Sequence, residues 1–145
     1  MADIERNATA VWNGSLREGN GKMSTGSGAL QETAYTFATR FEHSPGTNPE
    51  ELLAAAHAAC YSMALSGALT RREFSVESIT TQATCVLTPQ QPSGFKITKM
   101  KLVTRGKVAD ISPELFREVA EATKETCPVS GALAAIEIEL DAALA

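Results

Sequence analysis

The 145-residue sequence has only three cysteines, and no two of them form a C-x-x-C pair. An odd number of cysteines without that spacing argues against a disulfide scaffold and against a zinc site, which leaves reactive or merely buried thiols. Basic residues are also few, since 13 lysines and arginines against 17 acidic residues give a net charge of −4. Because the basic residues are scattered along the chain, nothing indicates a nucleic-acid-binding surface.

The N-terminal segment has neither the basic start nor the apolar run of a signal peptide. One stretch, Leu52 to Leu69, has the length of a membrane span, but it is mostly alanine and contains His57 and two serines. Alanine gains little in lipid, so this stretch is predicted to be a buried helix of a soluble protein and not a membrane span. We therefore expect a cytoplasmic protein without membrane contact, in a compartment where thiols stay reduced.

The chain is long enough for one domain with a hydrophobic core and short for two. Repeats, linkers and low-complexity tails are absent. Apolar periodicity and turn residues predict one α+β domain over residues 1–145. Its expected strands are 8–14, 22–30, 34–41, 74–88, 95–108 and 136–140, and its expected helices are 49–72, one opening at 112–114, and 128–135.

The helix over 49–72 has the clearest start in the sequence. Asn48 is a good N-cap residue, Pro49 falls at the first helical position, and Glu50 and Glu51 lie at the positive end of the helix dipole. Many of its side chains are small, so another backbone could approach closely. We therefore expect a central helix, and these small residues are Ala54, Ala55, Ala56, Ala58, Ala59 and Gly67.

The three cysteines differ in their local settings. Cys127 precedes Pro128 and falls at a helix N-cap, where free backbone N–H groups favour a thiolate, although it could also be only a small capping residue. Cys60 lies in the middle of the central helix, where the dipole has little effect and packing in the core is the simpler interpretation. These local settings thus predict a lower pKa for Cys127 than for Cys60. Cys85 lies in an alternating strand without a nearby charge and is expected to pack in the core.

A reactive Cys60 would need a cation to lower its pKa. His57, one turn earlier, is poorly aimed at its helical neighbour and is expected to be packed and hydrogen-bonded. Arg40, expected at the end of a strand, stays charged and could hold both a thiolate and a bound oxygen substrate, with Glu50 orienting it. Ten helical residues span about 15 Å, so Glu50 and Cys60 of one straight helix cannot share a site. Either the first turn bends away, or one of the two residues comes from a partner chain. The partner chain is favoured, because a helix of small residues suits close packing at a dimer axis.

Together these residues resemble a known family. The stretch TRFE…GTNPEELLAAAHAACYSMAL, followed roughly sixty residues later by CPVSGAL, is similar to the OsmC/Ohr family of organic hydroperoxide reductases, and to its OsmC branch in particular. The likeness runs from VWNG near the N-terminus to the closing IEIEL. It implies an α+β fold in which antiparallel sheets wrap around two long central helices of an intertwined homodimer, with active sites at the subunit interface.

By motif match, the resemblance makes Cys60 the peroxidatic thiol and Cys127 the resolving thiol. It assigns Arg40 to stabilise the thiolate and the peroxide, and Glu50 to orient Arg40. The Ohr branch draws its arginine from nearer the N-terminus, so Arg17 and Arg6 compete with Arg40.

The implied activity is reduction of an organic hydroperoxide to an alcohol. It passes through a Cys60 sulfenic acid and a Cys60–Cys127 disulfide, which an external dithiol reopens. Lipoylated proteins are the implied reductant in the Ohr branch, and no metal, flavin or haem is required. Two alternatives stay open: a Cys–His hydrolase or acyltransferase that uses Cys60 and His57, and a non-enzymatic stress protein that binds a hydrophobic ligand.

Overall fold

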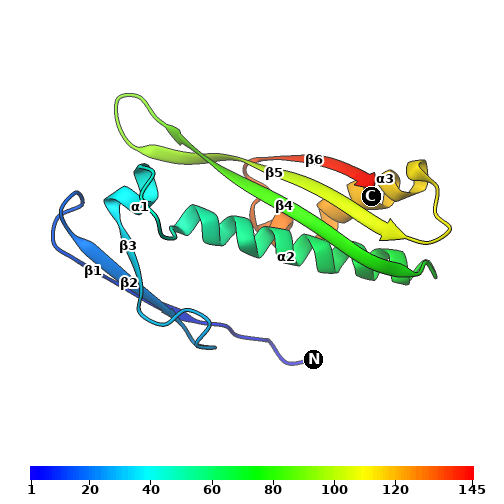
Figure 1. Cartoon of the computed structure of the whole chain (residues 1–145), viewed down its shortest axis with the longest axis horizontal. Coiled ribbons are helices and arrows are strands. Elements are labelled where there is room, and N and C mark those ends of the chain that lie inside the picture. The colour runs from blue at the N-terminus through cyan, green and yellow to red at the C-terminus, as the bar shows by residue number, and fades with distance from the viewer. The chain divides into compact units, whose positions relative to one another are not determined.

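The computed structural model describes residues 1–145. The chain forms two compact units, Met1–Pro49 and Glu50–Ala145. In the first unit, three antiparallel strands pair in the order β1-β2-β3 and a short helix follows the third (Figure 1). These elements are β1 (Ala8–Asn13), β2 (Asn20–Thr25), β3 (Thr33–Thr36) and α1 (Phe37–Phe41).

The strand predicted over residues 34–41 is wrong in its second half, because α1 begins at Phe37. Thr36 Oγ1 accepts a hydrogen bond from the backbone N–H of Thr39, and Thr39 Oγ1 accepts one from the backbone N–H of Thr36. This reciprocal capping box satisfies backbone donors that a helix start would otherwise leave unpaired. Arg40 therefore lies in a helical turn and not at the end of a strand.

The second unit contains a long helix, a three-stranded sheet and two shorter helices (Figure 1). The helix over 49–72 and the strand pair at 74–88 and 95–108 are confirmed to within two residues at each end. The predicted helix at 128–135 ends three residues early. The elements are α2 (Pro49–Thr70), β4 (Val76–Pro89), β5 (Phe95–Val108), α3 (Pro113–Thr126), α4 (Pro128–Ala132) and β6 (Glu137–Leu144).

The sheet of the second unit has the order β4-β5-β6. The expectation of a purely antiparallel sheet is wrong here. β4 and β5 form an antiparallel pair, whereas β6 runs parallel to β5, from Lys99 opposite Glu137 to Gly106 opposite Leu144. A parallel neighbour requires a crossover of a dozen or more residues, and α3 with α4 supplies it. The α+β class is confirmed, with this one change in the sheet.

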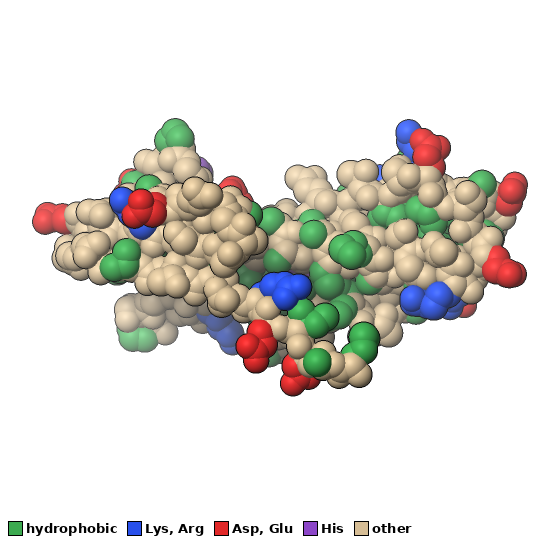
Figure 2. All heavy atoms as spheres, turned by 90° about the horizontal axis from the view of Figure 1, so that it is seen from below, with side chains coloured by type: hydrophobic (Ala, Val, Ile, Leu, Met, Phe, Trp, Pro, Cys, Tyr) green, Lys and Arg blue, Asp and Glu red, His purple; other side chains and the backbone are tan.

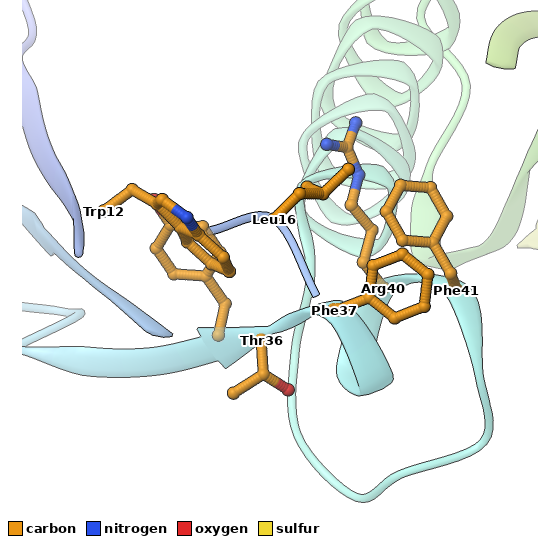
Figure 3. Close-up of a pocket in the computed structure, with 7 residues that line it drawn as sticks. Trp12, Leu16, Thr36, Phe37, Arg40 and Phe41 are labelled. Carbon is orange, nitrogen blue, oxygen red and sulfur yellow. The ribbon is translucent and has the colours of Figure 1, made fainter. Parts of the chain in front are cut away.

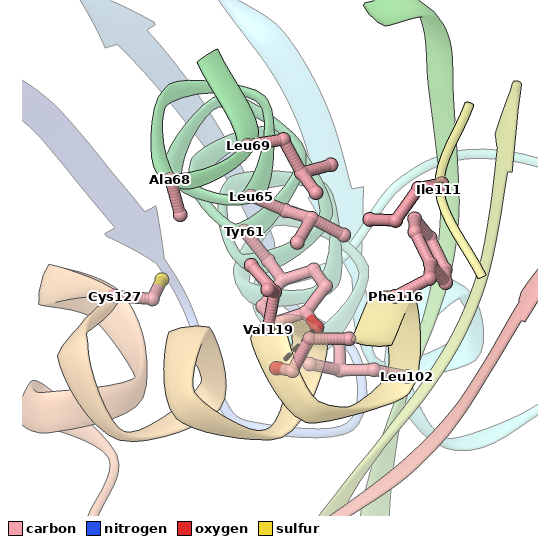
Figure 4. Close-up of a cluster of buried hydrophobic side chains, with 10 residues drawn as sticks. Tyr61, Leu65, Ala68, Leu69, Leu102, Ile111, Phe116, Val119 and Cys127 are labelled. Atoms are coloured by element: carbon pink, nitrogen blue, oxygen red, sulfur yellow. Dashed lines mark hydrogen bonds between the residues drawn. The ribbon is translucent and has the colours of Figure 1, made fainter. Parts of the chain in front are cut away.

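The hydrophobic core of the second unit lies where α2, α3 and β5 meet (Figure 4). Tyr61 is fully buried, and its hydroxyl donates a hydrogen bond of 2.8 Å from α2 to the carbonyl of Ala120 in α3. Phe116 packs against Gly106, where an added Cβ would lie 2.6 Å from the ring. The other fully buried core side chains include Leu65, Leu69, Leu102 and Val119, and each such side chain contributes roughly 1.5–3 kcal/mol.

One face of α2 is buried and the opposite face is open. The buried face carries His57, Tyr61, Leu65, Ala68 and Leu69, whereas Ala55, Ala56, Ala59 and Met63 are exposed. Met63 exposes 77% of its surface, and Figure 2 shows several hydrophobic side chains at the surface on one side of the molecule. By length and composition α2 meets the criterion for a membrane-spanning helix, which core helices of soluble proteins also meet.

Candidate functional site

The second unit brings two of the three cysteines together. Cys60, half-buried in the middle of α2, has its sulfur 3.3 Å from the sulfur of Cys127. Both thiols are free, and the separation exceeds the ~2.05 Å of a disulfide bond. Figure 4 shows the side chain of Cys127 directed toward α2. A modest side-chain movement would therefore bring the two sulfurs to bonding distance.

Local backbone structure explains the position of Cys127. It ends α3 and is the N-cap residue of α4, with φ −61° and ψ 126°. Because Pro128 disfavours the helical conformation in the residue before it, the chain breaks here and turns between the two helices. The predicted N-cap position is thus confirmed. Only 1% of the Cys127 surface is exposed, so the sulfur faces the interior.

The surroundings shift the two thiols in opposite directions. Burial raises the pKa of Cys60; the backbone N–H of Val129 opposes this shift, and Cys127 adds to it. Burial also acts to raise the pKa of Cys127, but hydrogen bonds from the backbone of Ser130, from Cys60, from the Ser130 hydroxyl and from the backbone of Val129 outweigh it and lower that pKa. Cys127 is therefore the more acidic thiol of the pair, as its predicted position at a helix N-cap indicated.

His57 is fully buried and hydrogen-bonded, as expected. Its Nε2 lies 2.8 Å from the hydroxyl oxygen of Ser130 in α4, and burial lowers its pKa, which favours the neutral ring. The ring is thus paired with Ser130 and not with Cys60, so the structure gives no support to a Cys–His hydrolase. Sequence reasoning missed Ser130, because its hydrogen bond to His57 joins residues that are 73 positions apart in the chain.

The third cysteine lies apart from the pair. Cys85 is half-buried in β4, directly opposite Met100 of β5. Burial and the charge of Glu50 both raise the pKa of the Cys85 thiol. The effect of Glu50 contradicts the expectation that no charge lies near Cys85, whereas the half-buried position of Cys85 opposite Met100 agrees with a packing role.

Glu50 lies at the start of α2 and is 7% exposed. α2 is a continuous helix from Pro49 to Thr70, so its first turn does not bend away. Ten helical residues still separate Glu50 from Cys60 by about 15 Å. Within one chain these two side chains do not share a site, which removes the first of the two alternatives left open by the sequence.

Arg40 lies in the first unit and lines a cavity of about 240 Å³. Figure 3 shows its side chain extending between Leu16 and the aromatic rings of Phe37 and Phe41. Its guanidinium carbon lies 5.1 Å from the ring centre of Phe41. The remaining lining residues are Trp12, Tyr35 and Thr36. This cavity combines a cation with apolar walls, a lining suited to an organic group next to a polar or negative one.

The two competing arginines also lie in the first unit. Arg17 stacks its guanidinium 4.9 Å from the ring centre of Phe37, which lines the same cavity. Arg6 donates a hydrogen bond to the carbonyl of Glu5 in an exposed segment. Because Arg17 contacts a residue that lines the same cavity as Arg40, it is the stronger of the two alternatives to Arg40.

Comparison with known proteins gives a consistent picture. The family model described as OsmC-like protein matches residues 41–141. The chain is 45% identical over 138 residues to Peroxiredoxin OsmC of Escherichia coli strain K12, covering 95% of each sequence. It is 30% identical over 112 residues to the organic hydroperoxide resistance protein OhrB of Bacillus subtilis strain 168, covering 77% of this chain and 80% of that protein.

Solved structures share the fold. The crystal structure of OhrB from Bacillus subtilis matches with a TM-score of 0.71 and 26% identity, over 96% of this chain and 98% of that one. An organic hydroperoxide resistance protein from Elizabethkingia anophelis matches with a TM-score of 0.76 and 22% identity over the whole of both chains. The arrangement of elements described above is therefore the fold of these proteins.

Proposed function

Because the chain belongs to the OsmC-like protein family, we propose that it is a thiol-dependent peroxidase that reduces organic hydroperoxides to alcohols in the cytoplasm. One observation carries the proposal: two free thiols, Cys60 and Cys127, lie with their sulfurs 3.3 Å apart. Such a pair can take up two oxidising equivalents as a disulfide without a metal or an organic cofactor. The names of the relatives, peroxiredoxin and organic hydroperoxide resistance protein, support peroxidase chemistry.

The first step in the proposal belongs to Cys60. Its thiolate attacks the outer peroxide oxygen, the O–O bond breaks, and the alkoxide takes up a proton and leaves as the alcohol. Sulfur is oxidised to a sulfenic acid while the peroxide is reduced. Exposure supports this order, because Cys60 is half-buried whereas Cys127 exposes 1% of its surface. A substrate can reach Cys60 more readily, although Cys127 is the more acidic thiol.

The second step belongs to Cys127. Its thiolate attacks the sulfur of the Cys60 sulfenic acid, the S–O bond breaks, and the oxygen leaves as hydroxide, which solvent protonates to water. An external dithiol then reduces the disulfide by thiol–disulfide exchange and restores both thiols. We propose a lipoyl group on a carrier protein as the natural dithiol, which is the reductant that the resemblance to the Ohr branch implies.

Arg40 is proposed to stabilise the Cys60 thiolate and the negative charge that develops on the peroxide. Since removing one such preorganised donor typically costs about 10²–10³ in rate, Arg40→Met is expected to lower kcat/KM for cumene hydroperoxide by about that factor. Arg17→Met tests the competing arginine in the same assay. A large loss for Arg17→Met with little change for Arg40→Met would transfer the role to Arg17.

A homodimer is proposed, in which the open face of α2 packs against the same face of a second copy. That face is apolar and mostly small at Ala55, Ala56 and Ala59, and Met63 is 77% exposed. A dimer would also allow Glu50 to serve the site of the partner chain. Residues 1–145 act as one domain in this proposal, and the family match over 41–141 spans both compact units.

Met63→Glu tests the dimer. Burying an unpaired carboxylate costs several kcal/mol, so the variant is expected to weaken dimerisation by at least roughly 100-fold and to lose peroxidase activity with it. Sedimentation and light scattering measure the mass in solution. Val103→Glu, at a 38% exposed position on β5, is the matched control and should stay dimeric. An active monomer of wild type or of Met63→Glu would contradict the proposal.

The activity itself is tested by following cumene and tert-butyl hydroperoxide under an excess of a dithiol such as dihydrolipoamide. We expect catalytic consumption of both, with slower turnover of hydrogen peroxide, which gains nothing from an apolar pocket. A wild-type protein that consumes no hydroperoxide would refute the proposal.

A further inference from the structure

His57 is a buried ionisable side chain that the proposed mechanism leaves unused. It is fully buried in α2, and its Nε2 lies 2.8 Å from Ser130 Oγ. Its other ring nitrogen, Nδ1, is buried without a hydrogen-bond partner. Leaving a buried polar atom unpaired is costly, so an apolar side chain would satisfy packing better at this position. The interaction that histidine makes here and an apolar side chain could not make is the hydrogen bond of its Nε2.

Ser130 connects His57 to the thiol pair. Cys127 is the N-cap residue of α4, and Ser130 is the third residue of that helix. A polar side chain at this third position can reach back toward the N-cap residue, and the Ser130 hydroxyl is among the groups that lower the pKa of Cys127. Ser130 is 3% exposed, so its hydroxyl has these two neighbours in place of water.

The unpaired Nδ1 indicates which atom is the donor in the hydrogen bond between His57 and Ser130. Burial favours the neutral ring, which has one proton on either Nδ1 or Nε2. A proton on Nδ1 would leave a buried N–H donor without an acceptor, a situation rarer in proteins than a buried acceptor without a donor. With the proton on Nε2, His57 donates to Ser130 Oγ, and the Ser130 hydrogen is then free to point at the sulfur of Cys127.

We propose that His57 and Ser130 form a donor chain, Nε2–H to Oγ–H to sulfur, that prepares Cys127 to attack the oxidised Cys60. The inference rests on the proposed peroxidase function and names the control of its second step. His57 acts through Ser130 and is thus a positioning residue. In the step itself the electron pair of the Cys127 thiolate forms the S–S bond and the S–O bond of Cys60 breaks. Cys127 is oxidised and Cys60 reduced, and the leaving hydroxide takes a proton from solvent.

Few other ionisable groups face this chain. Tyr61 stays protonated, because burial raises its pKa and its hydroxyl donates to the carbonyl of Ala120. Lys124 lies 3.2 Å from Glu121 in an ion pair. The ionisable groups around Cys127 and Ser130 come from two helices. On α2 they are Cys60 and Tyr61. On α3 they are Lys124 and Glu125, which line a cavity of about 230 Å³ together with Ser130.

The donor chain predicts a characteristic dependence on pH. Removing one hydrogen bond to a charged group should raise the pKa of Cys127 by about one unit. At a pH below the Cys127 pKa of both wild type and variant, the variant has about tenfold less Cys127 thiolate than wild type. Each thiolate of the variant is roughly threefold more reactive, because nucleophilicity rises with pKa. Disulfide formation should therefore be about threefold slower below the wild-type pKa and about threefold faster above the raised one. The two rate profiles cross.

The experiment oxidises each protein with one equivalent of cumene hydroperoxide and follows disulfide formation across pH by quenching and mass spectrometry. The variants are Ser130→Ala, His57→Phe and His57→Gln, the last because a glutamine amide can place an N–H near the position of Nε2. Ser62→Ala is the matched control, since it removes another half-buried hydroxyl, hydrogen-bonded to Thr81 at 2.9 Å.

Crossing profiles for Ser130→Ala and His57→Phe, a profile near wild type for His57→Gln and an unchanged Ser62→Ala are expected. Profiles that are lowered equally at every pH would mean that the two residues serve only packing, and would overturn the proposal. Nitrogen NMR of the wild type adds a direct check, because a proton found on Nδ1 would also overturn it.

A second measurement does not depend on peroxide chemistry. In a Cys60→Ser, Cys85→Ala background, ultraviolet absorbance of the thiolate reports the pKa of Cys127 alone. Adding Ser130→Ala or His57→Phe should raise that pKa by about one unit, and no change would overturn the donor chain. If wild type fails to form a sulfenic acid while this shift is present, the peroxidase function has failed and the donor chain stands.

Discussion

Replacing Cys60 with serine is expected to reduce hydroperoxide consumption to the uncatalysed background. The thiolate is the nucleophile in this chemistry, and a serine hydroxyl neither ionises near neutral pH nor takes up an oxygen atom. Cys60 is also the half-buried member of the pair, whereas Cys127 is 1% exposed and cannot readily replace it. Consumption of cumene hydroperoxide under excess dithiol measures the loss.

Cys85→Ser is the matched control for this experiment. Cys85 is the third free cysteine, and it lies in β4, apart from the two thiols whose sulfurs are 3.3 Å apart. The control variant should therefore keep wild-type activity. Full activity of Cys60→Ser would contradict the assignment, and loss of activity in Cys85→Ser would identify a different reactive thiol.

Replacing Cys127 with serine should leave Cys60 oxidised after about one turnover, with no catalytic recycling. The variant can still oxidise Cys60, but no second sulfur lies 3.3 Å away to form the disulfide. Under excess hydroperoxide, Cys60 should then continue to sulfinic acid, which an ordinary dithiol does not reverse. A burst of about one alcohol per site, a slower release of about one more as the sulfinic acid forms, and then a stall is the expected time course, with a dithiol that does not reduce the sulfenic acid directly.

Mass spectrometry of the stalled protein provides the control. Two added oxygens on Cys60 in Cys127→Ser, and a Cys60–Cys127 disulfide in wild type, are expected. Sustained turnover by Cys127→Ser with the same dithiol would show that Cys127 is not required as the resolving thiol.

Much of the second unit could be predicted from the sequence because its signals are local. Pro49 with Glu50 and Glu51 marks the start of α2, and Ser112 caps α3 by accepting a hydrogen bond from the backbone N–H of Leu115. Period-two alternation defines β4 and β5, and Pro128 places Cys127 at a helix start. These features depend on neighbouring residues only.

Other features depend on contacts between distant residues, and the sequence does not display them. The parallel pairing of β6 follows from the path of α3 and α4 and not from the alternation in β6 itself. His57 and Ser130 are 73 residues apart, so nothing local indicates their hydrogen bond. The helix at Arg40 was missed for a different reason: the threonines and aromatic residues of 33–41 favour strands, and the Thr36–Thr39 capping box overrides them.

The central claim is that Cys60 is oxidised first and Cys127 then resolves it. The most direct test treats Cys127→Ser and Cys60→Ser with one equivalent of cumene hydroperoxide, traps sulfenic acid with dimedone, and locates the adduct by mass spectrometry. A dimedone adduct on Cys60 in Cys127→Ser, with none on Cys127 in Cys60→Ser, is predicted. An adduct on Cys127 in Cys60→Ser, with Cys60 unmodified in Cys127→Ser, would reverse the two roles and make the more acidic thiol the one that meets the peroxide.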